Sequence, residues 1–161
     1  MRDAADIERA MDAHADAVWR ACLVYLTASD AEDVFQETFL KYALHDGPFR
    51  DDAHARAWLL RVAINGCKDA LRAARRRDVS LDERMERLGE GAVDAEAPSE
   101  LGLREVLDAM SALGDPPRTQ LYLALCEGYT AREIAGICDM PVGTVYSWIS
   151  RGKRRLRKVL S

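Results

Sequence analysis

The sequence predicts an all-α protein with two small helical domains, joined by a flexible acidic linker, of which the C-terminal one is a helix-turn-helix. Apolar residues recur at spacings of three and four along most of the 161 residues, as the buried face of a helix requires. No stretch alternates apolar and polar residues in the manner of a strand. Glycine, proline, serine and acidic residues collect between positions 78 and 100, a composition typical of linkers. These observations predict domains at 1–77 and 105–161, with the linker at 78–104.

The N-terminal domain is expected to contain three helices. Ser29 has capping-box spacing to Glu32, so the second helix should begin beside it. A glycine–proline pair ends that helix, and a third should run from about His54 to Arg77. Each helix should bury one stripe of side chains. The expected stripes are Ile7, Met11, His14, Val18, Cys22 and Tyr25 in the first helix, Phe35, Phe39 and Tyr42 in the second, and Leu60, Ile64, Cys67, Leu71 and Ala74 in the third.

Three helices are also predicted after the linker and its adjoining amphipathic segment. Gly128 is placed to end the first of them, because glycine accepts the left-handed backbone that follows many helices. Thr130 has capping-box spacing to Glu133 and should begin the second. Met140–Gly143 forms the turn, and Thr144 is the expected N-cap of the last helix. Two helices joined by so tight a turn form a helix-turn-helix.

Charge alternates along the chain, although the formal net charge is only −4. The net charge is −7 over residues 1–53, +6 over 54–77, −8 over 78–115 and +5 over 116–161. Because surface charges act over ~8 Å at physiological salt, a cationic segment can bind a polyanion despite the acidic total. One basic run alone fits a solvated helix face. Two basic runs separated by a linker favour a nucleic acid as the partner.

Both basic segments contain side chains suited to binding nucleic acid. In the third helix, cations and one amide form a polar stripe beside the core stripe. In a helix-turn-helix, the N-terminal residues of the last helix face base edges and later cations face phosphates. The stripe in the third helix comprises Arg61, Asn65, Lys68, Arg72 and Arg76. The reading residues of the last helix are Thr144, Tyr146, Ser147, Ser150 and Arg151, with Arg154 among the cations beyond them.

The sequence contains none of the motifs expected of an enzyme. Its histidines form no ligand cluster, and no nucleophile–base pair or phosphate-binding loop appears. The cysteines are widely spaced among apolar residues, which favours small buried side chains over a metal or redox role. No metal and no cofactor is therefore expected. The residues concerned are His14, His45, His54, Cys22, Cys67, Cys126 and Cys138.

The sequence also predicts a cytoplasmic protein without membrane insertion. No apolar run approaches the ~20 residues that cross a bilayer. The first residues, MRDAADIERAMDAHADAVW, are too acidic and too interrupted for a signal peptide.

Both ends of the chain resemble one known family. The stretches DAEDVFQETFLK and AWLLRVAINGCKDALR, within residues 10–77, resemble region 2 of sigma-70-type RNA polymerase sigma factors. The stretch EIAGICDMPVGTVYSWISRGKRRLR, within residues 105–160, resembles their region 4. A chain with these two regions alone, joined by a short linker, is similar to the extracytoplasmic function (ECF) group.

The resemblance implies a promoter-specificity subunit that binds core RNA polymerase and promotes DNA melting at the −10 element. The loop 46–52 and Asn65 would engage that element and capture one flipped base. Arg61 and Lys68 lie nearby, and a set of arginines would hold phosphates, namely Arg72, Arg75, Arg76 and Arg77. An acidic helix face would dock on the clamp helices of the polymerase β′ subunit, through Asp30, Glu32, Asp33, Gln36 and Glu37.

Region 4 would read the −35 element and contact the β flap, and the acidic linker would run toward the RNA exit path. The group also implies an anti-sigma factor as a partner. Tyr146 and Trp148 stand where family members often carry basic residues, which should weaken phosphate attraction.

Two alternatives remain beside this interpretation. Trp58 is a candidate for stacking on a base, although its apolar neighbours favour core packing. The chain could also be a stand-alone helix-turn-helix transcriptional regulator. That function would leave the acidic helix face and the second basic helix without a role.

Overall fold

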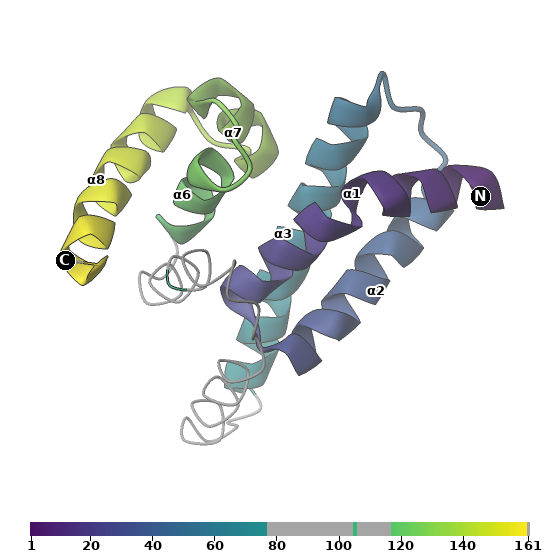
Figure 1. Cartoon of the computed structure of the whole chain (residues 1–161), viewed down its shortest axis with the longest axis horizontal. Helices are drawn as coiled ribbons and strands as arrows, with labels where there is room; N and C mark the ends of the chain where they lie inside the picture. The colour runs from purple at the N-terminus through teal and green to yellow at the C-terminus, as the bar shows by residue number, and fades with distance from the viewer. Residues whose placement is uncertain (77–104, 106–116, 161) are drawn as a thin grey trace. The chain divides into compact units, whose positions relative to one another are not determined.

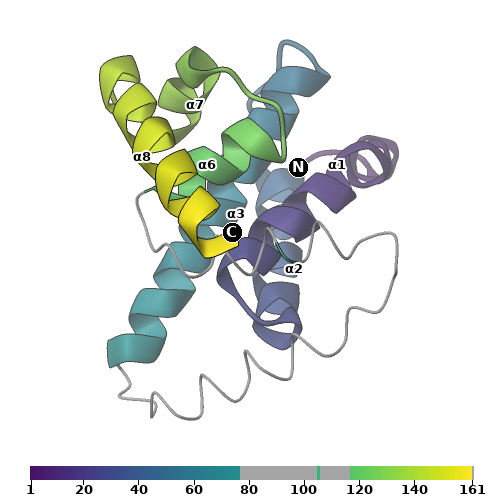
Figure 2. The ribbon, with the colours of Figure 1, turned by 60° about the vertical axis from the view of Figure 1, so that its left-hand side comes forward.

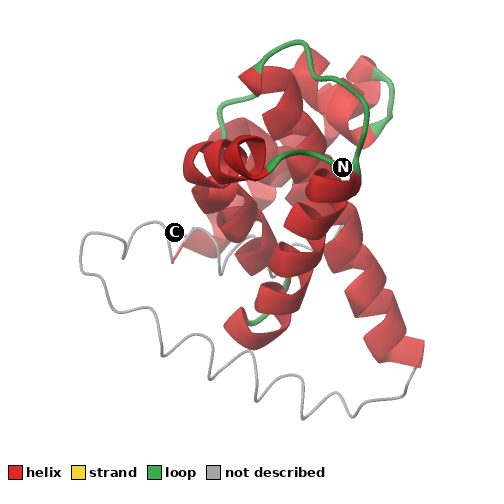
Figure 3. Ribbon diagram, turned by 90° about the vertical axis from the view of Figure 1, so that its right-hand side faces the viewer, coloured by secondary structure: helices red, strands yellow, loops and turns green. Residues whose placement is uncertain are grey.

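A computed structural model describes residues 1–76, 105 and 117–160 (Figure 1). All regular structure within these residues is helical, which confirms the all-α prediction (Figure 3). The chain divides into two compact units, Met1–Asp94 and Ala95–Ser161. The predicted linker, 78–104, and Arg77 lie outside the described residues. None of the described helices has both the length and the apolarity that are needed to cross a bilayer.

The first unit consists of α1 (Ala4–Tyr25), α2 (Ala28–Leu44) and α3 (Asp52–Arg76), and each helix packs on the other two (Figure 2). Met11 is 37% exposed, so its predicted place in the core is wrong. Burying an aliphatic side chain completely stabilises a fold by about 1.5–3 kcal/mol relative to exposure. Side chains of this unit without exposed surface include Val18, Cys22, Val24, Leu59, Leu60 and Cys67.

α2 begins earlier than predicted. Thr27 is the N-cap, because its backbone is extended and its hydroxyl accepts a hydrogen bond of 3.4 Å from the N–H of Asp30. Ser29 and Glu32 therefore lie inside the helix, and the predicted capping box between them is wrong. Threonine and serine can both cap a helix through a hydroxyl, so the spacing of Ser29 to Glu32 was not enough to exclude Thr27 as the cap.

α3 begins at Asp52, two residues before the predicted start at His54. The Asp51 carboxylate accepts a hydrogen bond of 2.8 Å from the N–H of His54, one of the donors that a helix start leaves without a partner. A negative side chain also suits the positive end of the helix dipole. The loop between α2 and α3 is thus fixed at its end by its own carboxylate.

The second unit contains α6 (Arg118–Leu125), α7 (Ala131–Cys138) and α8 (Val142–Leu160), which contact one another in every pairing. The packing of α7 against α8 across a short turn confirms the predicted helix-turn-helix.

The ends of α6 and α7 follow the sequence signals. Gly128 has a φ of 74° after α6, as predicted for a glycine that ends a helix. Thr130 and Glu133 form the predicted capping box of α7, with bonds of 3.2 and 2.9 Å. Asp139 ends α7 in the left-handed conformation, with its N–H bonded to the carbonyl of Ala135. Aspartate tolerates this conformation better than most residues.

α8 begins at Val142, so the turn ends at Pro141 and is shorter than the predicted 140–143. Thr144 lies within the first turn of the helix and is not its N-cap. The carbonyl of Pro141 instead accepts the first helical bond, 3.2 Å from the N–H of Val145. Proline is suited to this place because the start of a helix needs no N–H from it.

α8 approaches α6 closely at Gly152. A Cβ at this position would lie 3.2 Å from both Leu121 Cδ2 and Pro117 Cβ. Those distances are shorter than ordinary carbon contacts, and the proline ring cannot turn aside. Glycine at 152 therefore sets how near the two helices pack.

Alanine at Gly152 and at Gly136 should have opposite effects on the second unit. Gly136 lies in α7, and a Cβ there would meet no atom within 4 Å. Gly136→Ala should stabilise the unit by about 0.8 kcal/mol through helix propensity alone. Gly152→Ala should destabilise it by about 1 kcal/mol, because overpacking outweighs that gain. Hydrogen exchange of α6 and α8 amides measures both changes. Equal stabilisation by the two substitutions would contradict the close packing at Gly152.

Candidate nucleic-acid interface

The predicted polar stripe of α3 lies on the surface. Arg61, Asn65, Arg72, Arg75 and Arg76 are exposed, and Lys68 is half-buried. The helix turns about 100° per residue, so this stripe lies beside the buried face formed by Leu60, Ile64 and Cys67. The last turn carries two of the arginines, where the negative end of the helix dipole favours cations.

One arginine of the stripe has an acidic neighbour on the same helix. Arg72 Nη2 lies 2.5 Å from Asp69 Oδ1, and both side chains are more than half exposed. An exposed pair of this kind contributes about 0.3–0.5 kcal/mol and is screened by salt. A phosphate can therefore compete with Asp69 for the guanidinium.

The predicted acidic face of α2 is only partly uniform. Glu32, Asp33, Gln36 and Glu37 are exposed, whereas Asp30 is half-buried in the first turn. Asp30 lies at the helix start, where its charge favours the dipole. Four exposed polar groups thus remain on one face.

Two exposed leucines extend that face, and sequence reasoning missed them. Leu40 and Leu44 are 56% and 58% exposed and follow Gln36 at intervals of four. Residues four apart lie on the same face of a helix, so this spacing places both leucines on the polar face and not on the face of Phe39 and Tyr42. That spacing is the sequence signal that could have identified them. The α2 surface is therefore acidic in its first half and apolar in its second.

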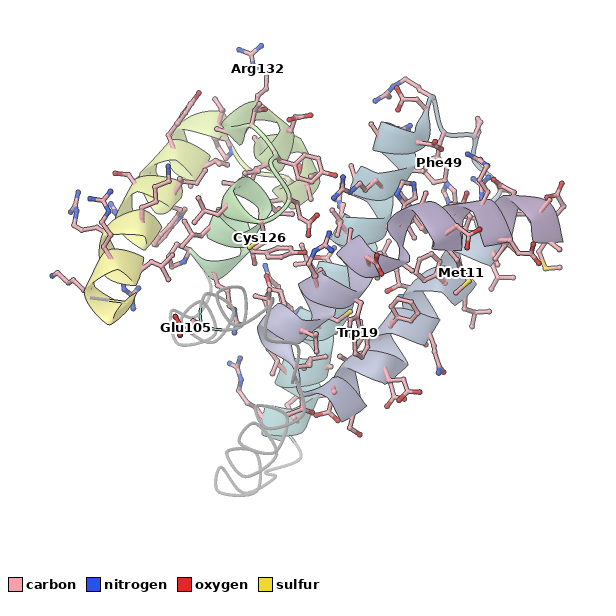
Figure 4. All side chains as sticks on the ribbon, in the orientation of Figure 1. Met11, Trp19, Phe49, Glu105, Cys126 and Arg132 are labelled. Carbon is pink, nitrogen blue, oxygen red and sulfur yellow. The ribbon has the colours of Figure 1, made fainter. Side chains whose placement is uncertain are left out.

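An aromatic cluster surrounds the loop between α2 and α3, which spans residues 45–51 rather than the predicted 46–52 because Asp52 begins α3. Phe49, labelled in Figure 4, has its ring centroid 5.9 Å from that of Tyr42 and 5.6 Å from that of Trp58. His45 lies 4.8 Å from Trp58, and His54 lies 5.2 Å from Phe49. Trp58 is half-buried and packs against the loop through these contacts.

Arg2 joins this cluster, although no sequence pattern pointed to it. Its guanidinium carbon lies 4.6 Å from the ring centroid of Tyr42 and 4.7 Å from that of Phe49. Arg2 Nη2 donates a hydrogen bond of 2.5 Å to the carbonyl of Gly47. The contacts join residues 40 or more positions apart, which a local periodicity cannot reveal.

Asp6 connects the charged groups around the loop. Its carboxylate accepts hydrogen bonds of 2.8 Å from both Arg2 and Arg9, which lower the pKa of Asp6. Arg9 also donates a bond of 2.7 Å to Asp52 at the start of α3. The hydroxyl of Tyr42 lies 3.3 Å from Asp6, and burial raises the pKa of Tyr42.

α8 turns its predicted reading residues away from the core. Tyr146 is 64% exposed, and Ser150, Arg151 and Arg154 are also exposed. Thr144 and Ser147 are half-buried. The opposite face is buried through Val145, Gly152 and Leu156.

Trp148 supports one of these cations. It is half-buried, and the guanidinium carbon of Arg151 lies 5.1 Å from the centroid of its ring. Such a cation–π contact favours one position of the guanidinium without removing its charge. Trp148 therefore helps to orient the guanidinium of Arg151.

The four cysteines and His14 are the side chains in which a metal or redox role was considered. Cys22 and Cys67 are buried as predicted, but Cys126 and Cys138 are half-buried, which corrects their prediction. Both half-buried cysteines lie at or beside the end of a short helix, where covering by neighbouring helices is incomplete. Burial lowers the pKa of His14, so its neutral form is favoured in the core. Among residues 1–76, 105 and 117–160, no three potential metal ligands gather.

Comparisons with known proteins match both units. Residues 10–77 match the family model of Sigma-70 region 2, and residues 103–156 match that of Sigma-70, region 4. The chain is 36% identical over 143 residues to the RNA polymerase sigma-H factor of Pseudomonas aeruginosa, covering 83% of this chain and 74% of the relative. It is 34% identical over 143 residues to the ECF RNA polymerase sigma-E factor of Haemophilus influenzae, covering 82% and 75%.

Two solved structures have the same fold. One is the sigma factor RpoE in complex with the anti-sigma factor NepR from Bartonella quintana, with a TM-score of 0.73, 23% identity and 96% of both chains covered. The other is CnrH in complex with the cytosolic domain of CnrY, with a TM-score of 0.69, 22% identity and 98% and 89% covered. The chain therefore belongs to the ECF group of the sigma-70 family and is a promoter-specificity subunit of RNA polymerase.

Proposed function

We propose that residues 1–77 bind core polymerase and the −10 element, that 78–104 form a linker, and that 105–161 bind the −35 element. The observation that carries this assignment is the exposure of a polar face in each unit. Exposed arginines lie beside the buried stripe of α3 and on the side of α8 that faces away from its buried residues. Each unit can thus pack its core and still present cations to DNA.

At the −10 element, Asn65 and the loop 45–51 hold one flipped base of the non-template strand. Extruding a base costs a few kcal/mol, which contacts to the unpaired strand must offset. Asn65 supplies amide hydrogen bonds, and the half-buried side chains of Phe49 and Trp58 supply stacking surface. Cations on the same stripe hold the backbone, namely Arg61, Lys68, Arg72, Arg75 and Arg76.

At the −35 element, α8 lies in the major groove with its first turns toward the bases. Tyr146, Ser147, Ser150 and Thr144 reach base edges, while Arg154 and its basic neighbours contact phosphates. Arg151, held against Trp148, contacts either a base or a phosphate from a restricted set of positions. An aromatic ring at 146 can also contact the methyl group of thymine.

The α2 surface docks on the β′ clamp helices. Its polar half consists of the carboxylates Glu32, Asp33 and Glu37 with the neutral amide Gln36, beside Asp30, and its apolar half is Leu40 and Leu44. Charge guides the encounter and desolvated leucines supply binding energy, a common division in protein interfaces. The second unit contacts the β flap.

A protein inhibitor would act by covering these same faces. Each of the two solved neighbours is a complex, and the Bartonella one contains an anti-sigma factor. A comparable partner of this chain would cover α2 and α8 and so exclude polymerase and DNA.

The chain acts in the cytoplasm and carries out no chemical step itself.

Transcription with purified core polymerase over a library of promoters tests this function. A sigma factor directs initiation only with core enzyme and selects two separated elements. Tight binding of the chain alone to duplex promoter DNA, with no initiation, would instead favour a stand-alone regulator.

Reversing the charge of the α2 surface should abolish core binding. The double variant Glu32→Lys, Asp33→Lys opposes the basic partner expected there, and like charges at an interface cost several kcal/mol. Glu8→Lys, Asp12→Lys reverses one glutamate and one aspartate that are exposed on α1, and it should bind core normally. Co-purification with core measures both. Loss of binding in both variants, or in neither, would contradict this docking surface.

Asn65→Ala should impair DNA melting more than initial binding. The amide acts only on the flipped base, so closed complexes should form with nearly normal affinity. Arg72→Ala should weaken both steps and reduce the slope of log affinity against log salt by about 1, because it removes one phosphate contact. Salt-dependent binding and permanganate reactivity of unpaired thymines separate the two steps. Equal losses in both steps for Asn65→Ala would exclude a role in base capture.

A further inference from the structure

We propose that three residues near the start of the chain, Arg2, Asp6 and Arg9, hold loop 45–51 in the shape that captures the −10 base. We call them the N-terminal clamp, and Arg2 is its principal positioning residue. The inference rests on the proposed function, because it takes this loop to engage the −10 element. The clamp residues themselves need not touch DNA.

Arg2 holds the middle of the loop. Its side chain is only 15% exposed, and it bonds to the carbonyl of Gly47 and to the carboxylate of Asp6. The same guanidinium lies over the ring of Phe49, which belongs to the loop, and over that of Tyr42, which precedes it. A charge-assisted hydrogen bond and cation–π contacts on one largely covered group give a stronger attachment than an exposed ion pair.

The clamp also holds both ends of the loop. At the end of α2, the backbone N–H of Arg2 donates a bond of 2.9 Å to the carbonyl of Ala43, and Tyr42 bonds to Asp6. At the start of α3, Arg9 bonds to Asp52. Since Asp6 joins Arg2 to Arg9, the middle and both ends of the loop are connected through one carboxylate.

The loop transmits a change at Gly47 to its aromatic side chains. The position at which a Cβ of residue 47 would stand lies 2.8 Å from His45 Nε2, so the loop is folded tightly over that ring. His45 in turn packs on Phe49 and Trp58, with centroids 5.3 and 4.8 Å away. Movement of Gly47 after loss of Arg2 would therefore displace the half-buried rings that are proposed to stack on the base.

A loop ordered before DNA arrives favours base capture. Fixing a flexible loop at the moment of binding lowers the net gain from its contacts. A preformed loop also discriminates better, because a base of the wrong shape cannot be accommodated by rearrangement. The clamp should thus affect melting and −10 selectivity, while the α2 surface and α8 keep their own contacts.

The test compares Arg2→Ala and Arg2→Lys in the full chain, with Glu8→Gln as the control. Glu8 is exposed on α1, and its substitution also changes one charge near the start of the chain. Arg2→Lys retains the charge beside Asp6 but lacks the planar fork that reaches Gly47 and the rings together. Three quantities are measured: hydrogen exchange of the His45 and Arg50 amides in the unbound chain, core affinity, and open-complex formation on promoters with each −10 base.

We expect exchange of the loop amides to become about tenfold faster in Arg2→Ala, as loss of a charge-assisted contact predicts. The rate of open-complex formation should fall about tenfold on the preferred promoter and less on the others. The preference for one −10 base over the others should therefore decrease. The affinity for core polymerase and the exchange rates of the α3 amides should stay within about twofold of the wild-type values. Loss of one contact would change them by more than that. Arg2→Lys should be intermediate, and Glu8→Gln should match wild type.

Unchanged loop exchange, or faster exchange with unchanged −10 selectivity, would overturn the clamp proposal alone. So would a loss of α3 protection in both Arg2 variants, because the residue would then stabilise the unit rather than position the loop. A wild-type chain whose initiation with core ignores the −10 sequence would overturn the proposed function together with this inference. Wild-type behaviour on the promoters therefore separates the two failures.

Discussion

Burial of one stripe of α3 is the constraint on which the rest of the first unit depends. Leu59, Leu60 and Cys67 are completely covered by α1 and α2, and their position fixes the rotation of the helix about its axis. Since an α-helix is rigid over its length, that rotation also fixes where Arg61 and Asn65 point. The polar stripe is exposed because the apolar stripe is buried, and no separate interaction is needed to display it.

In the second unit, too, burial of one helix face fixes which residues are exposed, and here a glycine permits the close packing of two helices. Val145 and Leu156 bury one side of α8, and Gly152 lets this helix approach Leu121 and Pro117. Tyr146 and Arg154 then face outward. Few residues of the long α8 are buried, so much of its surface stays exposed.

Periodicity in the sequence predicted what depends on neighbours along one helix, and it failed for contacts across the chain. The stripes of α3 and the capping box of α7 could be predicted, since their residues lie three or four apart. Arg2, which meets Gly47 and Phe49, could not be, because the pairing exists only after three helices have packed. Leu40 and Leu44 were missed because the neighbouring aromatic stripe also has helical spacing. Ser29 was predicted as the N-cap of α2 in place of Thr27 because either hydroxyl can cap a helix, and local spacing does not distinguish them.

The two cation-bearing units are proposed to bind separate stretches of one promoter while polymerase holds them at a fixed separation. Transcription with core enzyme should be measured as the spacer between the two elements is lengthened one base pair at a time. About 5 added base pairs place the −35 element on the opposite face of the duplex, since one turn takes 10–10.5 base pairs. The expected result is a narrow optimum and loss of initiation at that half turn. Initiation that continues unchanged across all spacer lengths would contradict simultaneous binding by both units.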